Sequence, residues 1–577
     1  MVMMKRFFIA LAFIPMFVQA NPVDKNTAIR VAENFWWQEF KERVTFNDYS
    51  EVLDLKEIYL FEEINDKGFI IISADDRAVP VLGYSRKAFV THNICPSMVS
   101  WLRSYEEQIA YARENDIKAD ETISDEWDAL KNGTPLPEPK AAIQVDPLLT
   151  SIWNQDEPYN LYCPGEGSDK APTGCVATAI AQVMNYWKYP EHGIGYNEYN
   201  YADYTDTNFG WTYGTLSADF ENTYYDWDNM VDTLRTTSDS ANIKAVALLN
   251  YHCGVALNML YKPGGSMAFV TIEDNIIFDT NHYPTRIAAE NIIPRFFGYS
   301  SAIEGRVRSE FDNVTAWINL LRDDLQKGRP IIFAGAAEEG PSAGHCFIID
   351  GCNPRLFFHI NMGWGGSYDG DYRIDAISPH GYNFNNRQQA IVGMRPPQLS
   401  SVHVVCSGGE NENSGVFHGQ TPVCNSFVSM TKGDAESVLN IEAGDGQIIG
   451  AIIVNNEVIF NYGTVLNPEN LIVQSSKNIS YDFTTIEDDV TLRVIFDTDE
   501  LAIDAPTSDA CQLMVYAKER NIVLKGGAIG HGDVYDIMGR KVAMFDGHGS
   551  ATATVPVSQS GVYIVRTDGM SRKVVVR

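Results

Sequence analysis

A single stretch near residue 180 constrains the fold most strongly, because it predicts a buried helix that begins on a cysteine. The apolar residues that recur there at helical spacing are Val176, Ile180, Val183, Met184 and Trp187. Gly174 permits a sharp turn just before this helix. Pro190 ends it, because the residue before a proline avoids the helical region. Cys175 is therefore expected in the first turn of a helix that packs in a core.

The position of Cys175 favours a reactive thiol. Unpaired backbone N–H groups and the helix dipole stabilise an anion at a helix N-terminus, and the thiolate is the nucleophilic form of cysteine. The alternative is a small buried cysteine that only packs. A histidine that could serve as its base would decide between the two interpretations.

His345 is the matching histidine. A short strand at residues 347–350 is followed by a turn and a second strand at 356–361, so the two strands are expected to pair antiparallel. With the turn centred near Asn353, His345 and Asn361 lie opposite each other and point to the same side of the sheet. The Asn361 amide could then orient the imidazole, as the third member of a nucleophile–base–orienter set does. The alternative is a core histidine and an unrelated strand-end asparagine.

These residues resemble the streptopain-like cysteine proteases, the C10 peptidases, across roughly residues 22–397. Four blocks carry the resemblance: LLTSIWNQDEPYN (148–160), GCVATAIAQVMNYWKYP (174–190), GHCFIIDG (344–351) and FHINMGWGG (358–366). The resemblance implies a papain-like fold in which Cys175 is the nucleophile, His345 the general base and Asn361 the orienting residue. It further implies that Trp364 is an aromatic lid over the histidine–asparagine pair.

The oxyanion hole is expected to combine the Cys175 backbone N–H with a side-chain donor. By analogy with the papain-like pattern, Gln155 is the candidate donor. Gln182 is the second candidate, but its place inside the predicted helix points to packing. Met362 departs from the family, which often has tryptophan there, so we expect the wall of the cleft to differ.

The composition excludes several classes of function. The chain has 577 residues, a net charge of −31 and a pI near 4.7, which argues against nucleic acid or anionic membranes as partners. Its nine cysteines form no CxxC pair, and there is neither an HExxH motif nor a phosphate-binding glycine loop. His345, Cys346 and Cys352 could form a metal site, but the hairpin already accounts for the histidine. We expect no metal and no cofactor.

The first 142 residues predict a secretory signal and an inhibitory prodomain. Residues 1–20 combine a positive start, a short apolar run and a small final residue, as a signal peptide does. Residues 21–142 are expected to form a separate small α+β domain. Its predicted elements are a helix capped by Asn26 and Thr27, strands at 58–61, 69–73 and 79–84, and a second helix from Pro96. The segment 68–85 resembles the propeptide of this protease family, which implies an intramolecular inhibitor; an unrelated binding domain is the alternative.

The rest of the chain predicts an α+β protease domain followed by β domains. Residues 143–397 place a helical part before a β-rich part, as expected for a papain-like catalytic domain. Residues 400–515 alternate short apolar strands with turns, which is typical of a β-sandwich. Residues 520–577 form another β unit, and its motifs resemble the C-terminal sorting domain of the type IX secretion system of Bacteroidetes. An ordinary terminal β domain is the alternative.

Together these features predict a secreted cysteine endopeptidase that is made as a zymogen and cleaves protein or peptide substrates. The signals at its two ends place it outside a Gram-negative cell or on the outer cell surface, with the secretion machinery as a partner. A Cys-His acyltransferase or amidase and a catalytically silent surface adhesin are the alternatives. The propeptide-like segment argues against the first, and an intact set of Cys175, His345 and Asn361 argues against the second.

Overall fold

The computed structural model describes most of the chain between residues 22 and 576. The described ranges are 22–65, 68–89, 94–139, 143–200, 213–272, 287–335, 344–377, 388–408, 414–461, 463–475, 477–486, 488–498, 514–518, 520–536, 541–558, 561–567 and 570–576. The predicted signal peptide lies outside them. The chain divides into two compact units, Met1–Phe496 and Asp497–Arg577, and each is described by itself.

The N-terminal part of the first unit combines helices with an antiparallel sheet. Its elements are α1 (Lys25–Phe40), β1 (Phe46–Asp48), β2 (Ile58–Glu63), β3 (Phe69–Ser73), β4 (Val81–Ser85), α2 (Pro96–Glu114) and α3 (Glu121–Asn132). The carboxylate of Asp24 caps α1 by accepting the backbone N–H groups of Asn26 and Thr27, at 3.0 and 3.1 Å. The prediction that Asn26 and Thr27 form the cap themselves was wrong, because Asp24 supplies the acceptor. Helix α3 was not predicted from the sequence.

The rest of the first unit as far as β12 (Gln389–Val392), called the protease part after its predicted role, has a helical half and a sheet half. Its helices are α4 (Cys175–Trp187), α5 (Ser240–Ala256), α7 (Ala289–Phe297) and α8 (Val314–Gln326). Its strands are β5 (Tyr196–Asn200), β6 (Thr215–Asp219), β7 (Glu304–Val307), β8 (Ile331–Gly335), β9 (His345–Cys352), β10 (Phe358–Asn361), β11 (Gly370–Tyr372) and β12 (Gln389–Val392). The predicted α+β fold class is confirmed.

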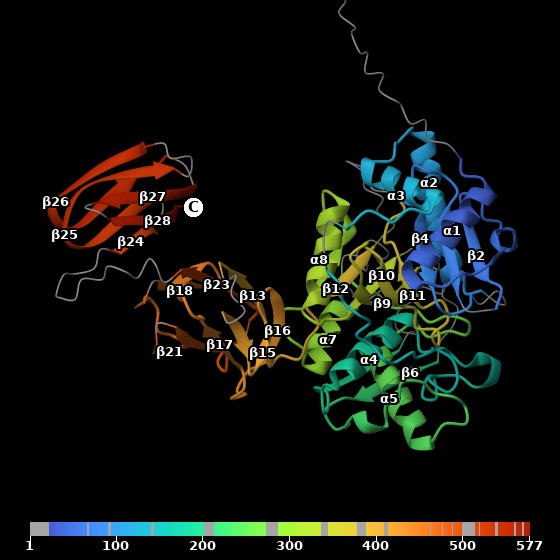
Figure 1. Cartoon of the computed structure of the whole chain (residues 1–577). Helices are drawn as coiled ribbons and strands as arrows, with labels where there is room; N and C mark the ends of the chain where they lie inside the picture. Colours follow the sequence, from blue (N-terminus) through green and yellow to red (C-terminus); the bar gives the residue numbers. More distant parts are fainter. Residues whose placement is uncertain are drawn as a thin grey trace, which may run out of the picture. The chain divides into compact units, whose positions relative to one another are not determined.

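Helix α4 lies in the core of the helical half, beside α5 (Figure 1). It begins on Cys175, as predicted. The turn before it requires a glycine, because Gly174 has a φ of 86° and a Cβ there would lie 2.7 Å from the side chain of Met259. The nucleophile candidate is therefore held at the start of a helix whose remaining turns are buried.

The N-terminal strands continue the sheet of the protease part. The strand order is β1-β2-β3-β4-β11-β10-β9-β8-β12-β7. β4 pairs antiparallel with β11, with Tyr84 opposite Asp371 and Gly83 opposite Tyr372 (Figure 1). Gly83 permits this approach, because a Cβ there would lie 2.5 Å from the Tyr372 ring. The sequence predicts a separate N-terminal domain, but in the structure its strands and core are continuous with those of the protease part.

The β9–β10 hairpin does not have the predicted register. A bulge at Asp350 of β9 shifts the register between His359 and Ile360, so that Asn361 pairs with Ile348. The connecting loop spans residues 353–357, so its centre lies near residue 355. Asn353 closes this loop through its side-chain oxygen, which accepts two backbone N–H groups of the loop, at 2.9 and 3.1 Å. His345 therefore does not lie opposite Asn361, and that prediction was wrong.

Residues 399–498 form a sandwich of two sheets around one apolar core. The first sheet has the order β16-β13-β23-β18-β19-β20 and the second β15-β14-β17-β22-β21. The strands are β13 (Leu399–Ser407), β14 (Gly415–His418), β15 (Thr421–Pro422), β16 (Ser426–Thr431), β17 (Val438–Glu442), β18 (Gln447–Val454), β19 (Glu457–Asn461), β20 (Thr464–Val465), β21 (Leu471–Ser475), β22 (Asn478–Asp482) and β23 (Val490–Thr498).

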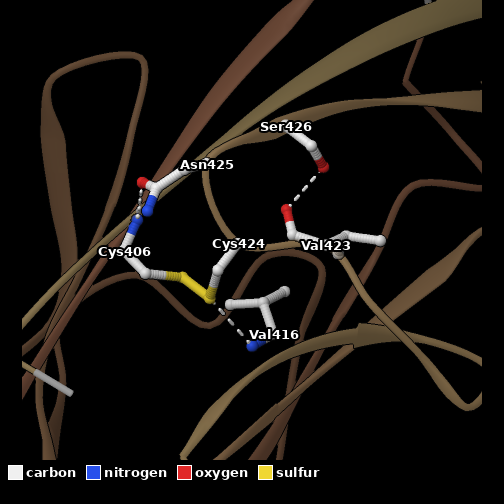
Figure 2. Close-up of a disulfide and its surroundings, with 6 residues drawn as sticks. All are labelled: Cys406, Val416, Val423, Cys424, Asn425 and Ser426. Carbon is white, nitrogen blue, oxygen red and sulfur yellow. Dashed lines mark hydrogen bonds between the residues drawn. A yellow bond between two sulfur atoms is a disulfide. The ribbon is translucent and has the colours of Figure 1, made fainter. Parts of the chain in front are cut away.

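A disulfide lies inside this sandwich. It joins Cys406 to Cys424, 18 residues apart in the sequence (Figure 2). Asn425 accepts the backbone N–H of Cys406 at 3.1 Å, and the backbone N–H of Val416 points to the Cys424 sulfur at 3.4 Å. The crosslink therefore ties β13 to the turn before β16, next to the start of β14.

An ion-pair network connects the sandwich to the protease part. Arg329 donates to both carboxylate oxygens of Asp489, at 2.8 and 2.6 Å, and lies 3.5 Å from Asp324. Asp489 also accepts the backbone N–H of Ser401 at 3.0 Å. Burial opposes ionisation, but Arg329 outweighs it and lowers the pKa of Asp489 to about 2. The connection therefore stays ionised across the neutral pH range.

The second unit is a single β-sheet with its own core. Its strands are β24 (Met514–Lys518), β25 (Asn521–Asp536), β26 (Lys541–Pro556), β27 (Gly561–Thr567) and β28 (Met570–Val576). They follow the order β24-β25-β27-β28, and β26 pairs with β25. Among the described residues of the whole chain, no helix has the length and apolarity that a membrane crossing requires.

Candidate active site

Cys175 heads α4 and is partly exposed. The backbone N–H groups of Cys346 in β9 and of Val176 in its own helix act to lower the pKa of the Cys175 thiol. Burial nevertheless outweighs these contacts and raises the pKa of the Cys175 thiol. In this state the residue is therefore mainly the neutral thiol, which is the less nucleophilic form.

His345 begins β9 and is held by two contacts. Its Nε2 lies 2.8 Å from the backbone carbonyl oxygen of Met362, and its ring stacks on Trp364 with centroids 4.0 Å apart and planes 15° apart. A carbonyl oxygen can only accept, so the contact assigns the proton to Nε2. Burial lowers the pKa of His345 to about 4. The imidazole is therefore neutral, and its protonated nitrogen is engaged by the backbone.

No hydrogen bond joins Cys175 to His345, although both residues are described. The alternation of side chains along β9 explains this. Cys346 belongs to the core on the α4 side, whereas Phe347 belongs to the core that contains the prodomain helices. His345 is on the side of Phe347, with ring centroids 5.9 Å apart. The strand thus starts beside the thiol but directs its histidine to the opposite face of the sheet.

Asn361 is buried at the end of β10 and is fully engaged. Its Nδ2 donates to the backbone carbonyl of Ser151 at 2.7 Å. Its Oδ1 accepts the backbone N–H of Gly363 at 3.1 Å and the side-chain amide of Gln182 at 3.2 Å. The expected hydrogen bond from His345 to Asn361 is absent from the structure, since the imidazole is bound to the carbonyl of Met362 instead.

The loop that carries Gln155 runs beside the start of α4. The backbone carbonyl of Gln155 accepts the N–H of Thr173 at 3.0 Å, two residues before Cys175. The same loop contacts the segment after β10, because the N–H of Gly365 donates to the carbonyl of Trp153 at 3.0 Å. The Gln155 side chain makes no hydrogen bond to any residue that the structure describes.

Prodomain aromatic residues bracket the histidine. Trp101 of α2 meets Phe347 edge-on at 5.4 Å. On the other side, Phe89 meets Tyr368 at 4.9 Å, and Tyr368 meets Trp364 at 5.8 Å. Because Phe347 and Trp364 both contact His345, this row of rings has prodomain side chains at both ends. The prodomain therefore packs against the residues that hold the imidazole in place.

Carboxyl groups gather where α1 faces β11. Burial is the main cause that raises the pKa of Asp371 to about 6; His359 opposes the shift, and Glu39 of α1 and Asp350 add to it. Burial also raises the pKa of Glu39, against the attraction of Arg355. The Nδ1–H of His359 donates to the carboxylate of Asp350 at 2.6 Å. Ionisation of both Glu39 and Asp371 is therefore unfavourable while the prodomain is docked.

The position of Gln182 inside the predicted helix pointed to packing, but in the structure its side chain lies among the candidate site residues. It bonds to Asn361 and to the loop that carries Gln155. A polar side chain in the middle of an apolar helix was the available signal. Within the part of the chain that the structure describes, no group of three or more His, Cys, Asp or Glu side chains is arranged to hold a metal ion.

Comparison with known proteins places this geometry in a family. Residues 153–372 match the peptidase C10 family, and residues 20–109 match the Spi protease inhibitor family. Streptopain of Streptococcus pyogenes is 32% identical over 354 residues, which cover 58% of this chain and 79% of streptopain. The chain belongs to the peptidase C10 family. It is a cysteine-type endopeptidase made as a zymogen, it acts on protein substrates, and its N-terminal part is an intramolecular inhibitor domain.

Two further relatives extend the comparison. The thiol protease/hemagglutinin PrtT of Porphyromonas gingivalis is 27% identical over 435 residues, which cover 70% of this chain and 45% of PrtT. The structure of prointerpain A of Prevotella intermedia is 33% identical, covers 61% of this chain and 98% of its own, and has a TM-score of 0.48. The family match and the identity to streptopain confirm the resemblance to the C10 peptidases, and the alternatives of an acyltransferase and a silent adhesin are not supported.

Proposed function

We propose that this C10 peptidase hydrolyses peptide bonds with Cys175 as nucleophile, His345 as general base and acid, and Asn361 as the residue that orients the imidazole. Gln155 and the Cys175 backbone N–H form the oxyanion hole, and Trp364 covers the histidine–asparagine pair. The observation that carries the proposal is the position of Cys175 at the N-terminus of α4, a helix that packs against β9, the strand that begins on His345.

In the active enzyme His345 takes the thiol proton, and the Cys175 sulfur attacks the substrate carbonyl carbon. The oxyanion that forms accepts the Cys175 N–H and the Gln155 amide. His345 then protonates the leaving amine, and a thioester remains on Cys175. His345 next takes a proton from water, which attacks the thioester and releases the new carboxyl terminus.

This mechanism requires His345 to leave the position that it has here. The imidazole is bound to the Met362 carbonyl and stacked on Trp364. Prodomain rings pack against Phe347 and Tyr368 in the same aromatic row, Trp101 on the first and Phe89 on the second. Release of the prodomain removes Trp101 and Phe89 and frees this aromatic row. We infer that the prodomain keeps the zymogen inactive by holding the base away from the nucleophile.

The cut that releases the prodomain is proposed to lie between Lys140 and Asp146. Residues 140–142 lie outside the described residues, so this part of the prediction has no structural counterpart. Val145 already belongs to the protease part, because it exchanges two backbone hydrogen bonds with Cys352, at 2.8 and 2.9 Å. We therefore place the cut before Val145. Sequencing of the N-terminus of the active enzyme tests this, and an active species that begins near residue 21 would refute it.

The protein is proposed to act outside the cell. The predicted signal at residues 1–20 supports export across the inner membrane, and the type IX-like motifs of residues 520–577 support passage across the outer membrane. The Cys406–Cys424 disulfide supports the same interpretation, since disulfides persist mainly in oxidising compartments. The secretion machinery is then a partner of the second unit.

The base and its orienting residue are tested with variants of the activated enzyme. His345→Ala should lower kcat/KM by roughly 1000-fold or more, and Asn361→Ala should cost less, because it only orients the base. His418→Ala, in the sandwich, is the matched control and should retain parental activity. If folded His345→Ala cleaved peptides at the rate of His418→Ala, the proposed base would be wrong.

A further inference from the structure

Gln182 is completely buried in an otherwise apolar stretch of α4. It lies seven residues after Cys175, two helical turns along nearly the same face. Burying an amide without partners costs free energy, and an apolar residue would fill the site without that cost. The presence of a glutamine here therefore points to a role for its hydrogen bonds.

Those hydrogen bonds join the segments that carry the proposed site. The Oε1 of Gln182 accepts the backbone N–H of Trp153 at 2.9 Å and the hydroxyl of Ser151 at 3.1 Å. Its Nε2 donates to the Oδ1 of Asn361 at 3.2 Å. One side chain thus connects the nucleophile helix, the loop that leads to Gln155 and the end of β10.

This arrangement leaves the Asn361 amide only one orientation. The Ser151 carbonyl can only accept, so it must face the Nδ2 of Asn361. The backbone N–H of Gly363 can only donate, so it must face Oδ1. Gln182 is oriented by the same logic, because the Trp153 N–H must face its Oε1, which leaves its Nε2 for Asn361.

We propose that Gln182 is a positioning residue for catalysis, which shares the Asn361 oxygen with the Gly363 N–H and so fixes the amide that orients the imidazole of His345. The inference rests on the proposed role of Asn361 and assigns its control to a residue on the nucleophile helix. Gln182 touches neither the substrate nor the reacting atoms. It acts on the rate of the chemical step through the orientation of Asn361.

Gln182→Glu separates this role from simple packing. When protonated, the introduced carboxyl reproduces the native pattern, with one oxygen accepting from Trp153 and Ser151 and the hydroxyl donating to Asn361. When ionised, it turns an acceptor towards the Asn361 oxygen. Burial raises a carboxyl pKa, so the switch should fall within the assay range. The expected result is near-parental kcat at pH 5 and a loss of roughly 10- to 100-fold by pH 7.5, with KM unchanged.

The measurement uses the full chain after activation and an internally quenched peptide that the parent cleaves, with rates normalised to titrated active sites. Asn250→Asp is the matched control. It places the same amide-to-acid change in a buried position of α5, where the Asn250 amide bonds only within its own helix. It should show no new loss of kcat between pH 5 and pH 7.5. Thermal unfolding at both pH values confirms that each variant is folded.

Gln182→Leu provides the second arm and should lower kcat at every pH. On an Asn361→Ala background it should add no further loss of kcat, because the residue it positions is gone. A parental pH profile for Gln182→Glu would overturn the inference, and so would additive losses in the double variant. If Gln182→Leu does not fold, the pH dependence of kcat for Gln182→Glu alone decides whether Gln182 is a positioning residue.

The failure of this inference can be told apart from the failure of the proposed function. If Asn361→Ala alone keeps parental kcat, Asn361 does not orient the base and both proposals fall. If Asn361→Ala loses activity while both Gln182 variants keep parental kcat and pH dependence, only the role of Gln182 is wrong.

Discussion

The imidazole of His345 lies face to face with the indole of Trp364, 4.0 Å from centroid to centroid, and donates to the backbone carbonyl of Met362. These contacts occupy the histidine on the face of the sheet opposite to Cys175. The zymogen thus contains every proposed catalytic group, but the base and the nucleophile are apart. We infer that the zymogen is inactive because His345 is held away from Cys175, as well as because the prodomain limits access to the site.

The reactivity of the Cys175 thiol should rise when the prodomain leaves. Burial raises its pKa in the zymogen, and no imidazole is available to take its proton. We expect the rate of Cys175 alkylation by iodoacetamide at pH 7 to increase about tenfold or more on activation. Mass spectrometry of the labelled Cys175 peptide measures it.

Cys95 of the prodomain is the internal control for that labelling, because it is also a partly exposed free cysteine. Its labelling reports general accessibility in the zymogen. The account of latency would be contradicted if Cys175 were alkylated equally fast before and after activation, while Cys95 of the zymogen was alkylated readily.

The prodomain should be held more tightly in mild acid than at neutral pH. Burial, assisted by Glu39 and Asp350 and opposed by His359, raises the pKa of Asp371 to about 6 in the docked state. When the prodomain leaves, Asp371 regains its ordinary pKa of about 4. A carboxyl whose pKa is raised by docking favours docking when protonated. The contribution of protonated Asp371 to docking is complete below pH 4 and is lost as the pH rises through 6. The affinity of the prodomain for the protease part should therefore fall about tenfold between pH 5 and pH 7.5.

The other charged groups at this boundary do not reverse the sign. Burial also raises the pKa of Glu39 and of Asp369, although Lys87 lies 3.3 Å from the latter. Arg373 and Glu126 form an ion pair across this boundary, at 3.3 Å, which strengthens docking. Size-exclusion chromatography of the cleaved complex at pH 5 and pH 7.5 measures retention of the prodomain.

Two interface variants sharpen this pH test. Asp371→Asn should hold the prodomain at pH 7.5 nearly as well as at pH 5, because the amide cannot ionise. Glu126→Gln should weaken docking at both pH values and keep the pH dependence. Tighter retention at pH 7.5 than at pH 5 in the parent would show that other groups dominate.

The disulfide should stabilise the sandwich without affecting catalysis. Closing a loop of this length removes unfolded-state entropy worth about 3 kcal/mol. A Cys406→Ser, Cys424→Ser variant should therefore lower the thermal stability of residues 399–498 and make them more sensitive to limited proteolysis. Peptidase activity at low temperature should be parental. An unchanged unfolding temperature would mean that the sandwich core alone sets its stability.

Deletion of residues 522–577 should affect export and leave catalysis intact. The second unit has its own core, and the candidate site residues all belong to the first. In a cell with the type IX machinery, we expect the truncated enzyme to accumulate in the periplasm. Fractionation with a peptidase assay of each compartment measures this. Normal amounts of truncated enzyme in the medium would show that the second unit is a terminal β domain without a role in export.

The local features of the site could be predicted from the sequence. The helix that begins on Cys175 follows from its apolar spacing and from Gly174, and the structure confirms it. The hairpin that carries His345 and Asn361 was also expected, but its register was not. Loop length and a bulge decide register, and the bulge at Asp350 has no clear signal in the sequence.

Contacts between residues that are far apart in the sequence were harder to predict from the sequence. The pairing of β4 with β11 depends on Gly83 lying under Tyr372, nearly 300 residues away in the sequence. The role of Gln182 was missed for the same reason, since its partners Ser151 and Asn361 are distant in the chain. A helix pattern alone distinguishes polar from apolar positions, but it does not show which polar groups meet.

The role of Cys175 as the nucleophile is tested by comparing peptide cleavage by the parent and by a Cys175→Ala variant. Parent and Cys175→Ala chains are freed of the prodomain with the same external protease and incubated with a peptide library, and cleavage is read by mass spectrometry. Alanine at a partly exposed helix start should cost little stability, which thermal unfolding verifies. The account predicts cleavage by the parent and none by folded Cys175→Ala. Cleavage of the same bonds by a clean, folded Cys175→Ala preparation would contradict it.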